Sequence, residues 1–513
     1  MSSANRVISN TGFLYAKMLI TMFVALFSTR LVLQALGAED FGIFSLVSGI
    51  VLLLAFVNAA ISTSTQRFIS ICLGSGDSEK VADVFRTSLQ LHLGLAIFLA
   101  FLLELVGLFI FDGFLNIPSE RMAASKIIYH FMVVSTFFTI ISVPYVAALV
   151  AHEDFWFEAL IGIAGSILKL IVAVVLFYSN GDRLVLYGAL MAGIIVINCL
   201  LNVVFAIVKY EECKRIQLNV FDRRLMGEMS SFACWNLFGA LCSVGRAQGT
   251  AVILNVFFGT IVNAAYGVAR QVSSQTSTFS VNMLKALSPL IMKSEGGGDR
   301  QKMLYLSMVA SRFGYFLLAF FAVPLIAEAP FVLDVWLKTV PDYTVIFCRL
   351  ILIGGLVGQI TIGLQTAAQS VGKIKLYQSV VGSLLLLNVP VSWVVLKMGY
   401  NAYVVFLIAI FFELLAAVLR IFFLRKLAGL PVGQYVKEVV VRGCLCTIPV
   451  VVTVLLVQLF LPPGWLRLFS VVAVSSVTFC VTIYCIGMNG REKKQVISIM
   501  HTVPQKIKAR MSA

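Results

Sequence analysis

Long apolar runs, each about the length of a membrane-spanning helix, occupy most of this 513-residue chain. A helix needs roughly 20 mainly apolar residues to cross the hydrocarbon core of a bilayer, and about fourteen runs of that length are present. They cover residues 11–35, 41–64, 87–111, 127–150, 155–178, 184–208, 232–258, 261–291, 304–329, 344–368, 376–396, 402–424, 439–461 and 465–487. This pattern predicts an all-α, polytopic membrane protein with about fourteen transmembrane helices.

The composition points to the same class of protein. Hydrophobic residues make up 60% of the chain and charged residues only 12%, whereas soluble domains carry about 25% charged residues. So few charges cannot cover the surface of a soluble enzyme of this size. The ten cysteines form no CxxC pair and the four histidines are scattered, so we expect neither a metal site nor a disulfide framework.

The formal net charge of +15 comes mainly from loop cations. Lys and Arg residues gather in alternate loops, for example at Arg223, Arg224, Lys293 and Arg300, and near both ends of the chain. Because cytoplasmic loops of membrane proteins carry most of the cations, we predict that both termini are cytoplasmic. Anionic lipid, rather than nucleic acid, then explains the excess charge. The basic tail 489–513 fits an interfacial helix and a solvated tail equally well.

Two glycine-containing turns recur along the sequence. GAEDFG (37–42) closes the first predicted helical hairpin, and FGTIVN (258–263) closes the hairpin of the seventh and eighth spans. At the same offset downstream lie GSGDSE (74–79) and GGGDR (296–300). A long repeat in a transporter indicates two related halves that bind substrate between them near the midplane. The predicted parts are 1–210 and 211–427 as six-helix lobes, 428–488 as two further helices, and 489–513 as the tail.

Several cations lie inside the predicted spans: Lys17, Arg30, Lys169, Arg246, Arg270, Arg312 and Arg349. A cation at the bilayer centre costs roughly 2.5–3.5 kcal/mol unless it faces water or a partner. Arginine cannot avoid this cost by losing its proton. Arg30 and Arg349 lie nearer the outer boundary, where a long side chain can reach the interface. The deeper cations favour a water-filled, cationic cavity.

Polar side chains accompany these cations at helical spacing. Asn236, Ser243, Arg246 and Thr250 share one face of their helix, Gln271, Gln275, Thr278 and Asn282 share a face of the next helix beside Arg270, and Asn58, Ser62 and Thr65 do so in the second span. We expect Asn58, Asn236, Ser243, Thr250, Gln271, Gln275 and Asn282 to line the cavity, although such stripes also serve as contacts between helices.

Glu104 and Glu413 are the central carboxylates of the predicted spans. Each is either a site for a coupling ion, Na⁺ or H⁺, or the partner of a deep cation, and both roles remain open. Four deep cations against two carboxylates leave the interior net positive. Such an interior attracts an anionic headgroup through charge-assisted hydrogen bonds and repels lipophilic cations.

Five segments carry a resemblance to a known family: TRLVLQALGAEDFGIF (29–44), TQRFISICLG (65–74), VPYVAALVAHE (143–153), FACWNLFG (232–239) and NVFFGTIVNAAYGVARQV (255–272). In order and spacing they resemble the polysaccharide-transporter branch of the MOP flippase superfamily, the Wzx-type O-antigen and capsule flippases. The resemblance extends over essentially the whole chain. Asp154 departs from it, because a basic residue usually follows the glutamate of the third segment.

The resemblance implies a MATE-like V of two six-helix lobes with two further C-terminal helices. It also implies alternating-access flipping of a polyprenyl-diphosphate-linked oligosaccharide (an O-antigen, capsule or exopolysaccharide repeat unit) across the bacterial inner membrane, coupled to an ion or to the membrane potential. Arg30, Arg246, Arg270, Lys17 and Lys169 would engage the diphosphate. The implied partners are the lipid bilayer, this glycan lipid and other polysaccharide assembly proteins, without nucleic acid and without a cofactor beyond the coupling ion.

Two other classes of protein remain open. A MATE-like multidrug or metabolite antiporter would need carboxylates in its cavity. An integral-membrane glycan polymerase or ligase would need a sizeable outer loop to present acid and base groups to its substrate. The outer loops here are short, so we expect a transporter rather than an enzyme.

Overall fold

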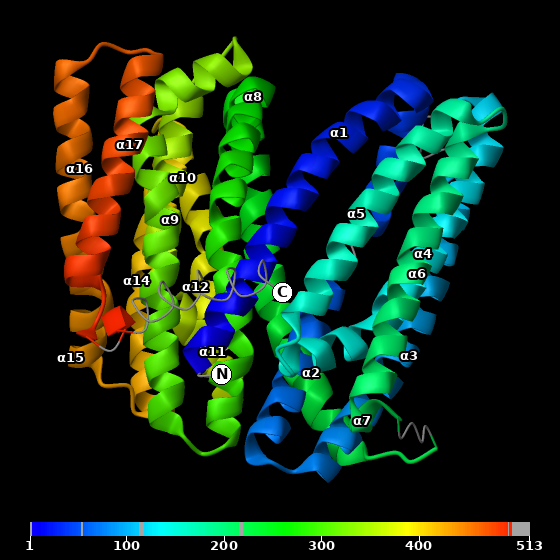
Figure 1. The fold of residues 1–513 in the computed structure, drawn as a ribbon. Helices are drawn as coiled ribbons and strands as arrows, with labels where there is room; N and C mark the ends of the chain where they lie inside the picture. The colour runs from blue at the N-terminus through cyan, green and yellow to red at the C-terminus, as the bar shows by residue number, and fades with distance from the viewer. Residues whose placement is uncertain (1–2, 53–54, 112–116, 215–218, 491, 495–513) are drawn as a thin grey trace, which may run out of the picture. The chain divides into compact units, whose positions relative to one another are not determined.

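The computed structural model describes residues 3–52, 55–111, 117–214, 219–490 and 492–494. Within these ranges the chain forms helices joined by short turns, without a strand (Figure 1). In lipid a helix satisfies its own backbone hydrogen bonds, whereas an open strand does not. The predicted all-α class is confirmed.

The chain divides into two compact units, each with its own core. The N-unit comprises Asn10–Ala240 and Met292–Gly298, and the C-unit comprises Met1–Ser9, Leu241–Ile291 and Asp299–Ala513. Helix α8 contributes to both units. The predicted lobes, with limits at residues 210 and 427, are defined by counting six spans in each, whereas these units are defined by contacts. The predicted limits therefore stay predictions.

The N-unit is built around α4, which packs against α2, α3 and α6. One of its cores joins Phe85 and Tyr145, whose rings meet edge to face with centroids 5.2 Å apart. Its helices are α1 (Ser3–Leu52), α2 (Ala55–Ser75), α3 (Ser78–Ile110), η1 (Ser119–Arg121), α4 (Met122–Ala151), α5 (Phe155–Tyr178), α6 (Arg183–Lys209) and α7 (Glu211–Lys214).

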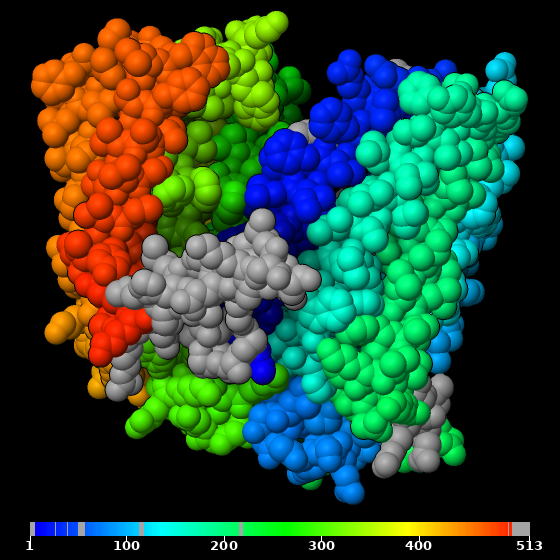
Figure 2. Space-filling model, viewed as in Figure 1, coloured from blue at the N-terminus to red at the C-terminus, as the bar shows by residue number. Residues whose placement is uncertain are grey.

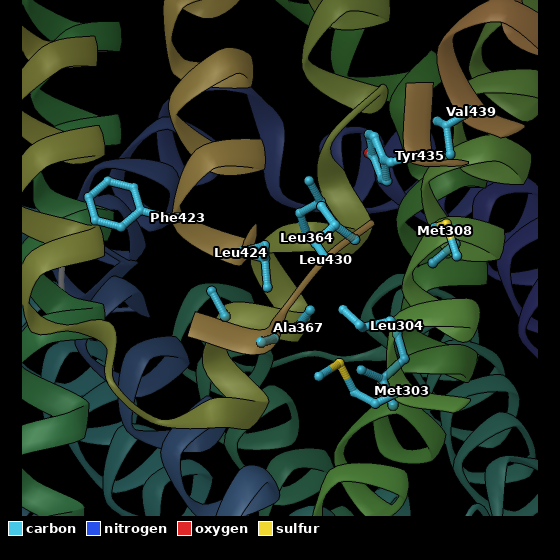
Figure 3. Close-up of a cluster of buried hydrophobic side chains, with 14 of the residues drawn as sticks. Met303, Leu304, Met308, Leu364, Ala367, Phe423, Leu424, Leu430, Tyr435 and Val439 are labelled. Carbon is cyan, nitrogen blue, oxygen red and sulfur yellow. The ribbon is translucent and has the colours of Figure 1, made fainter. Parts of the chain in front are cut away.

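Apart from Met1–Ser9, the C-unit starts at Leu241 within α8 (Arg223–Gly296) and takes in the described helices after Asp299. Figure 3 shows its largest core, in which Met303, Leu364, Leu424 and Tyr435 are buried together. Its other helices are α9 (Arg300–Leu337), α10 (Thr344–Gln359), α11 (Ile362–Val371), α12 (Ile374–Leu386), α13 (Asn388–Lys397), α14 (Val404–Ala428), α15 (Val432–Tyr435), the π-helix η2 (Val436–Val441), α16 (Arg442–Phe460), α17 (Trp465–Thr482) and the π-helix η3 (Ile483–Gly487).

The predicted repeat is visible in the backbone. Gly37 interrupts α1 with φ 79° and ψ 168°, and Gly259 interrupts α8 with φ 81° and ψ −171°. Only glycine adopts this region readily. The same number of residues separates Gly76 from Gly298, which both have φ 76°. Each of these is followed by an aspartate that caps the next helix. Each glycine turn of the first half therefore has the same backbone conformation as its counterpart in the second half.

The described residues contain eleven helices that are long and apolar enough to cross a membrane, or twelve if the bent pair α10–α11 is one span. This figure counts α8 once, although Gly259 divides its 74 residues into two arms. The prediction of about fourteen spans counted those arms separately. It also included 41–64, which runs over residues 53 and 54, outside the described ranges. The protein is a multi-pass membrane protein.

Large apolar side chains are exposed on α16 and α17, the orange and red helices of Figure 2. Leu459, Phe460 and Phe469 are between 65% and 81% exposed. In water such a surface would be unfavourable, but lipid tails are as apolar as these side chains. In the predicted tail, Glu492 accepts a hydrogen bond from Tyr305 and Lys493 donates one to the carbonyl of Cys485, both within the C-unit. Residues 495–513 of the tail lie outside the described ranges.

Candidate functional site

Arg246, Glu413 and Arg420 form an ion cluster in the C-unit. Arg246 on α8 donates from Nη1 to Oε2 of Glu413 at 3.1 Å, and Arg420 donates from Nη1 to Oε1 of the same carboxylate at 2.8 Å. The side chain of Arg420 is 4% exposed and that of Arg246 is 29% exposed. One carboxylate serves two guanidinium groups, so the cluster keeps a positive charge, and Arg246 is its more exposed end.

A break in the membrane helix between α10 and α11 supports this cluster. The two helices bend by 42°, and Thr361 in the break accepts a hydrogen bond from Arg420 at 3.0 Å. The hydroxyl of Tyr435 donates to the carbonyl of Ile360 at 2.5 Å, which gives a backbone group at the break a partner. Gly358 leaves room for Glu413, whose Oε1 would lie 3.3 Å from a Cβ at that position.

Tyr266 brings Arg270 to the same part of the C-unit. Its hydroxyl donates to the carbonyl of Ala247, next to Arg246, at 3.2 Å. The guanidinium carbon of Arg270 lies 5.8 Å from the centroid of the Tyr266 ring, within the range of a cation–π interaction. Arg270 is exposed and has no ion pair among the residues that the structure describes. The C-unit thus brings Arg246 and Arg270 to the same region. Glu413 is the carboxylate that pairs with Arg246, and it also pairs with Arg420.

The N-unit carries the other three predicted cations on α1 and α5. Lys17 is partly neutralised, since its Nζ lies 2.9 Å from Glu158 on α5, and its side chain covers Gly162. Ser28 donates to the carbonyl of Lys169 at 3.4 Å, so α1 and α5 meet at this level. Arg30 and Lys169 are both exposed, and neither has an ion pair within the described part of the chain.

The predicted polar lining divides by burial. Ser243, Gln271 and Gln275 are exposed, while Asn58 and Asn282 are half-buried. Asn236 and Thr250 are buried, at 7% and 4% exposure. Thr250 donates to the carbonyl of Arg246 at 2.8 Å. The exposed members are therefore the ones whose side chains can reach water, lipid or a ligand.

The remaining deep charges have local partners. Arg312 is buried and bonds to Glu438 at 3.0 Å and to Glu492, so it adds no free positive charge. Glu104 lies 3.0 Å from His130, and its side chain is 44% exposed. Its possible role as a coupling-ion site stays a prediction, as does that of Glu413.

Arg420 lies within the predicted span 402–424, but it is not among the predicted residues of the site. A signal for it was present, because Glu413 and Arg420 are seven residues apart and so share one face of α14. Glu158 also carried a signal, as a carboxylate in the first turn of α5. Thr361 carried none, because its role depends on a break that the apolar run 344–368 does not reveal.

Asp154, where the sequence departs from the family pattern, is matched by a cation from another helix. It accepts hydrogen bonds from Lys209 at 2.7 Å and from the Tyr210 hydroxyl at 2.6 Å, at the end of α6. Burial raises the pKa of Asp154, but these hydrogen bonds outweigh burial and leave the pKa below its usual value. The acidic turn therefore does not disturb the charge pattern of its side of the protein.

Comparison with known proteins places this geometry on a known fold. Residues 14–175, just under one third of the chain, match the MatE family model. No curated protein sequence matches the chain. A solved MATE structure in the bent conformation is 14% identical, with 86% of this chain and 98% of that chain covered and a TM-score of 0.73.

Two further solved structures are each 15% identical, with 85% of this chain and 97% of theirs covered and a TM-score of 0.70. One is an outward-facing multidrug resistance MATE family transporter of the MOP superfamily. The other is a MOP superfamily transporter from Pyrococcus furiosus, for which reverse polarity of the binding pocket suggests a different function. The chain therefore has the MATE transporter fold.

Replacing Glu413 with Gln should destabilise the C-unit. The substitution leaves the buried Arg420 without its counter-charge, and breaking a buried pair in this way costs about 3–5 kcal/mol. Arg246→Ala should cost less than about 1 kcal/mol, because Glu413 then remains paired with Arg420 and Arg246 is partly exposed. Thermal unfolding of the purified protein in detergent measures both. Equal melting temperatures for the two variants would contradict the role assigned to Glu413.

Asp154 should make stability depend on pH at the acid end. Because its pKa is lowered in the folded protein, its contribution is present above the unfolded pKa, near 4, and is lost as pH falls through the folded value. Asp154→Asn should therefore lower the melting temperature at pH 7, by an amount that corresponds to about 1.5–3 kcal/mol. The difference from the unmodified protein should shrink below pH 4. A difference that is constant from pH 7 to pH 3 would exclude this role.

Proposed function

We propose that the protein is a transporter that flips a polyprenyl-diphosphate-linked oligosaccharide across the bacterial inner membrane by alternating access. The observation that carries the proposal is the exposed positive charge within the membrane-spanning helices. In the C-unit, Arg246 and Arg270 gather at Tyr266. In the N-unit, Arg30 and Lys169 are exposed on α1 and α5.

A diphosphate group is the ligand chemistry that these residues favour. Guanidinium groups form bidentate, charge-assisted hydrogen bonds to phosphate oxygens, which are stronger than bonds between neutral groups. Arg246 is suited to this, since its partner Glu413 is also held by Arg420 and stays neutralised when Arg246 turns to a ligand. An anion bound here would supply the counter-charge that Arg270 lacks among the described residues.

The fold and the backbone repeat support alternating access. Transporters built from two related halves move by rocking one half against the other around a central substrate site. The matching glycines at 37 and 259 and at 76 and 298 are consistent with such halves. We further propose that both termini are cytoplasmic, and that the membrane potential or a coupling ion, Na⁺ or H⁺, drives the cycle.

A MATE-like antiporter of drugs or metabolites is the second candidate, and the shared fold is what favours it. The charge of the candidate site argues against lipophilic cations as its cargo, because Arg246 and Arg420 share the one carboxylate of Glu413, and Arg270 nearby has no ion pair among the described residues. Resistance to cationic drugs on overexpression, without any effect on surface glycan, would favour the antiporter.

Arg246→Ala and Arg270→Ala should each reduce binding of undecaprenyl diphosphate by roughly tenfold, the loss expected from one charge-assisted hydrogen bond of about 1.5 kcal/mol. The measurement uses purified protein in nanodiscs, with undecaprenol as the lipid that lacks phosphate. Arg224→Ala is the matched control, because Arg224 is on the same helix but its side chain is 90% exposed. In cells, Arg246→Ala should stop export of surface glycan at an unchanged protein level.

Two results would contradict the proposed function. One is equal affinity for undecaprenyl diphosphate and undecaprenol. The other is normal surface glycan in cells whose only copy carries both substitutions.

A further inference from the structure

The last turns of α8 pack differently from the long part of the helix that precedes them. Leu241–Ile291 belong to the C-unit, whereas Met292–Gly298 belong to the N-unit by their contacts. This short segment includes the end of a membrane helix and the glycine turn that follows it. The site of the proposed function does not use it.

Two glycines hold the segment against the end of α2. A Cβ atom at Gly296 would collide with the backbone of Ile71, and one at Gly74 would collide with the backbone of Lys293. The same number of residues separates Gly74 from Gly296 and Ile71 from Lys293, so the contact is reciprocal between the two halves of the repeat. Backbones approach this closely only where side chains are absent.

An ion pair closes the same contact. Lys293 donates from Nζ to Oε1 of Glu153 at 2.6 Å, and the side chain of Glu153 is 1% exposed. Glu153 has a φ of 65°, a left-handed conformation that costs a non-glycine residue energy and persists only where its surroundings hold it. The strained residue thus lies in the turn between α4 and α5 and bonds to the end of α8.

We propose that Met292–Gly298 is a latch, fastened by Glu153–Lys293 and by the Gly74–Gly296 crossing, that releases from the N-unit and re-forms in each transport cycle. The requirement for release rests on the proposed function, because alternating access needs contacts that break and re-form. The fastening itself does not rest on that function. An ion pair and a crossing without side chains can each be made or broken, which gives the two discrete states, fastened and released, that a switching element needs.

Hydrogen exchange of the protein in nanodiscs tests the fastening without any substrate. Glu153→Gln should speed amide exchange in residues 292–298 by about tenfold, as expected for loss of one buried charge-assisted hydrogen bond. Lys293→Gln should give the same increase, and the double variant no more than either single one. The control is Glu79→Gln, an exposed residue in the first turn of α3, which should leave exchange in 292–298 unchanged. Additive effects, or no effect of Glu153→Gln, would overturn the latch.

A reversible cross-link tests the release. With the ten native cysteines replaced, Glu153→Cys and Lys293→Cys are joined by a short bifunctional methanethiosulfonate and later freed with dithiothreitol. The joined protein should flip undecaprenyl-diphosphate-linked glycan in proteoliposomes at least about tenfold more slowly than the freed protein. Equal rates would overturn the release. If the unmodified protein shows no flipping in the same proteoliposomes, the proposed function has failed, while the exchange measurement still decides the fastening.

Discussion

The permanent charge of arginine in a medium of low dielectric constant is the constraint on which this structure depends. A guanidinium cannot become neutral by losing its proton, so inside a membrane it needs a carboxylate, a polar partner or water. Arg312 and Arg420 are buried and have carboxylate partners. Arg270 and Arg30 are exposed and have none among the described residues. We infer that water or an anionic ligand meets the charge of these two arginines.

Glu413 contacts both a buried and a partly exposed arginine. Its position between Arg246 and Arg420 lets one carboxylate fix a buried arginine while it orients a partly exposed one. Because Arg420 is more deeply buried than Arg246, we expect the carboxylate to matter more for stability than Arg246 does.

The fold also depends on glycine. At glycine the backbone of a membrane helix can bend, or can come very close to the backbone of another helix. Gly37 and Gly259 each kink a helix without a separate loop. Gly74 and Gly296 let two helix ends cross within contact of their backbones. Because these positions recur at a constant offset, the repeat is a property of backbone geometry more than of side-chain identity.

Much of the fold could be predicted from the sequence, since the length of the apolar runs and the two glycine turns depend only on local residues. The deep cations on α1, α5 and α8 were likewise predictable from their cost in lipid. The partners of these cations could not be predicted. Glu413, for example, could have been either a coupling-ion site or the partner of a cation. Arg312 bonds to Glu438 and Glu492, which are far away along the chain, and only tertiary packing brings such groups together.

The central claim is that exposed cations of the spanning helices face water rather than lipid. Its most direct test is the reaction of Arg270→Cys, in an otherwise cysteine-free protein in proteoliposomes, with a charged, membrane-impermeant methanethiosulfonate. Val452→Cys, on the apolar face of α16, serves as the lipid-facing reference. We expect position 270 to react much faster than position 452 and to be protected by undecaprenyl diphosphate. Equally slow reaction at both positions would show that Arg270 lies in lipid, and the assignment of a phosphate-binding cation there would be wrong.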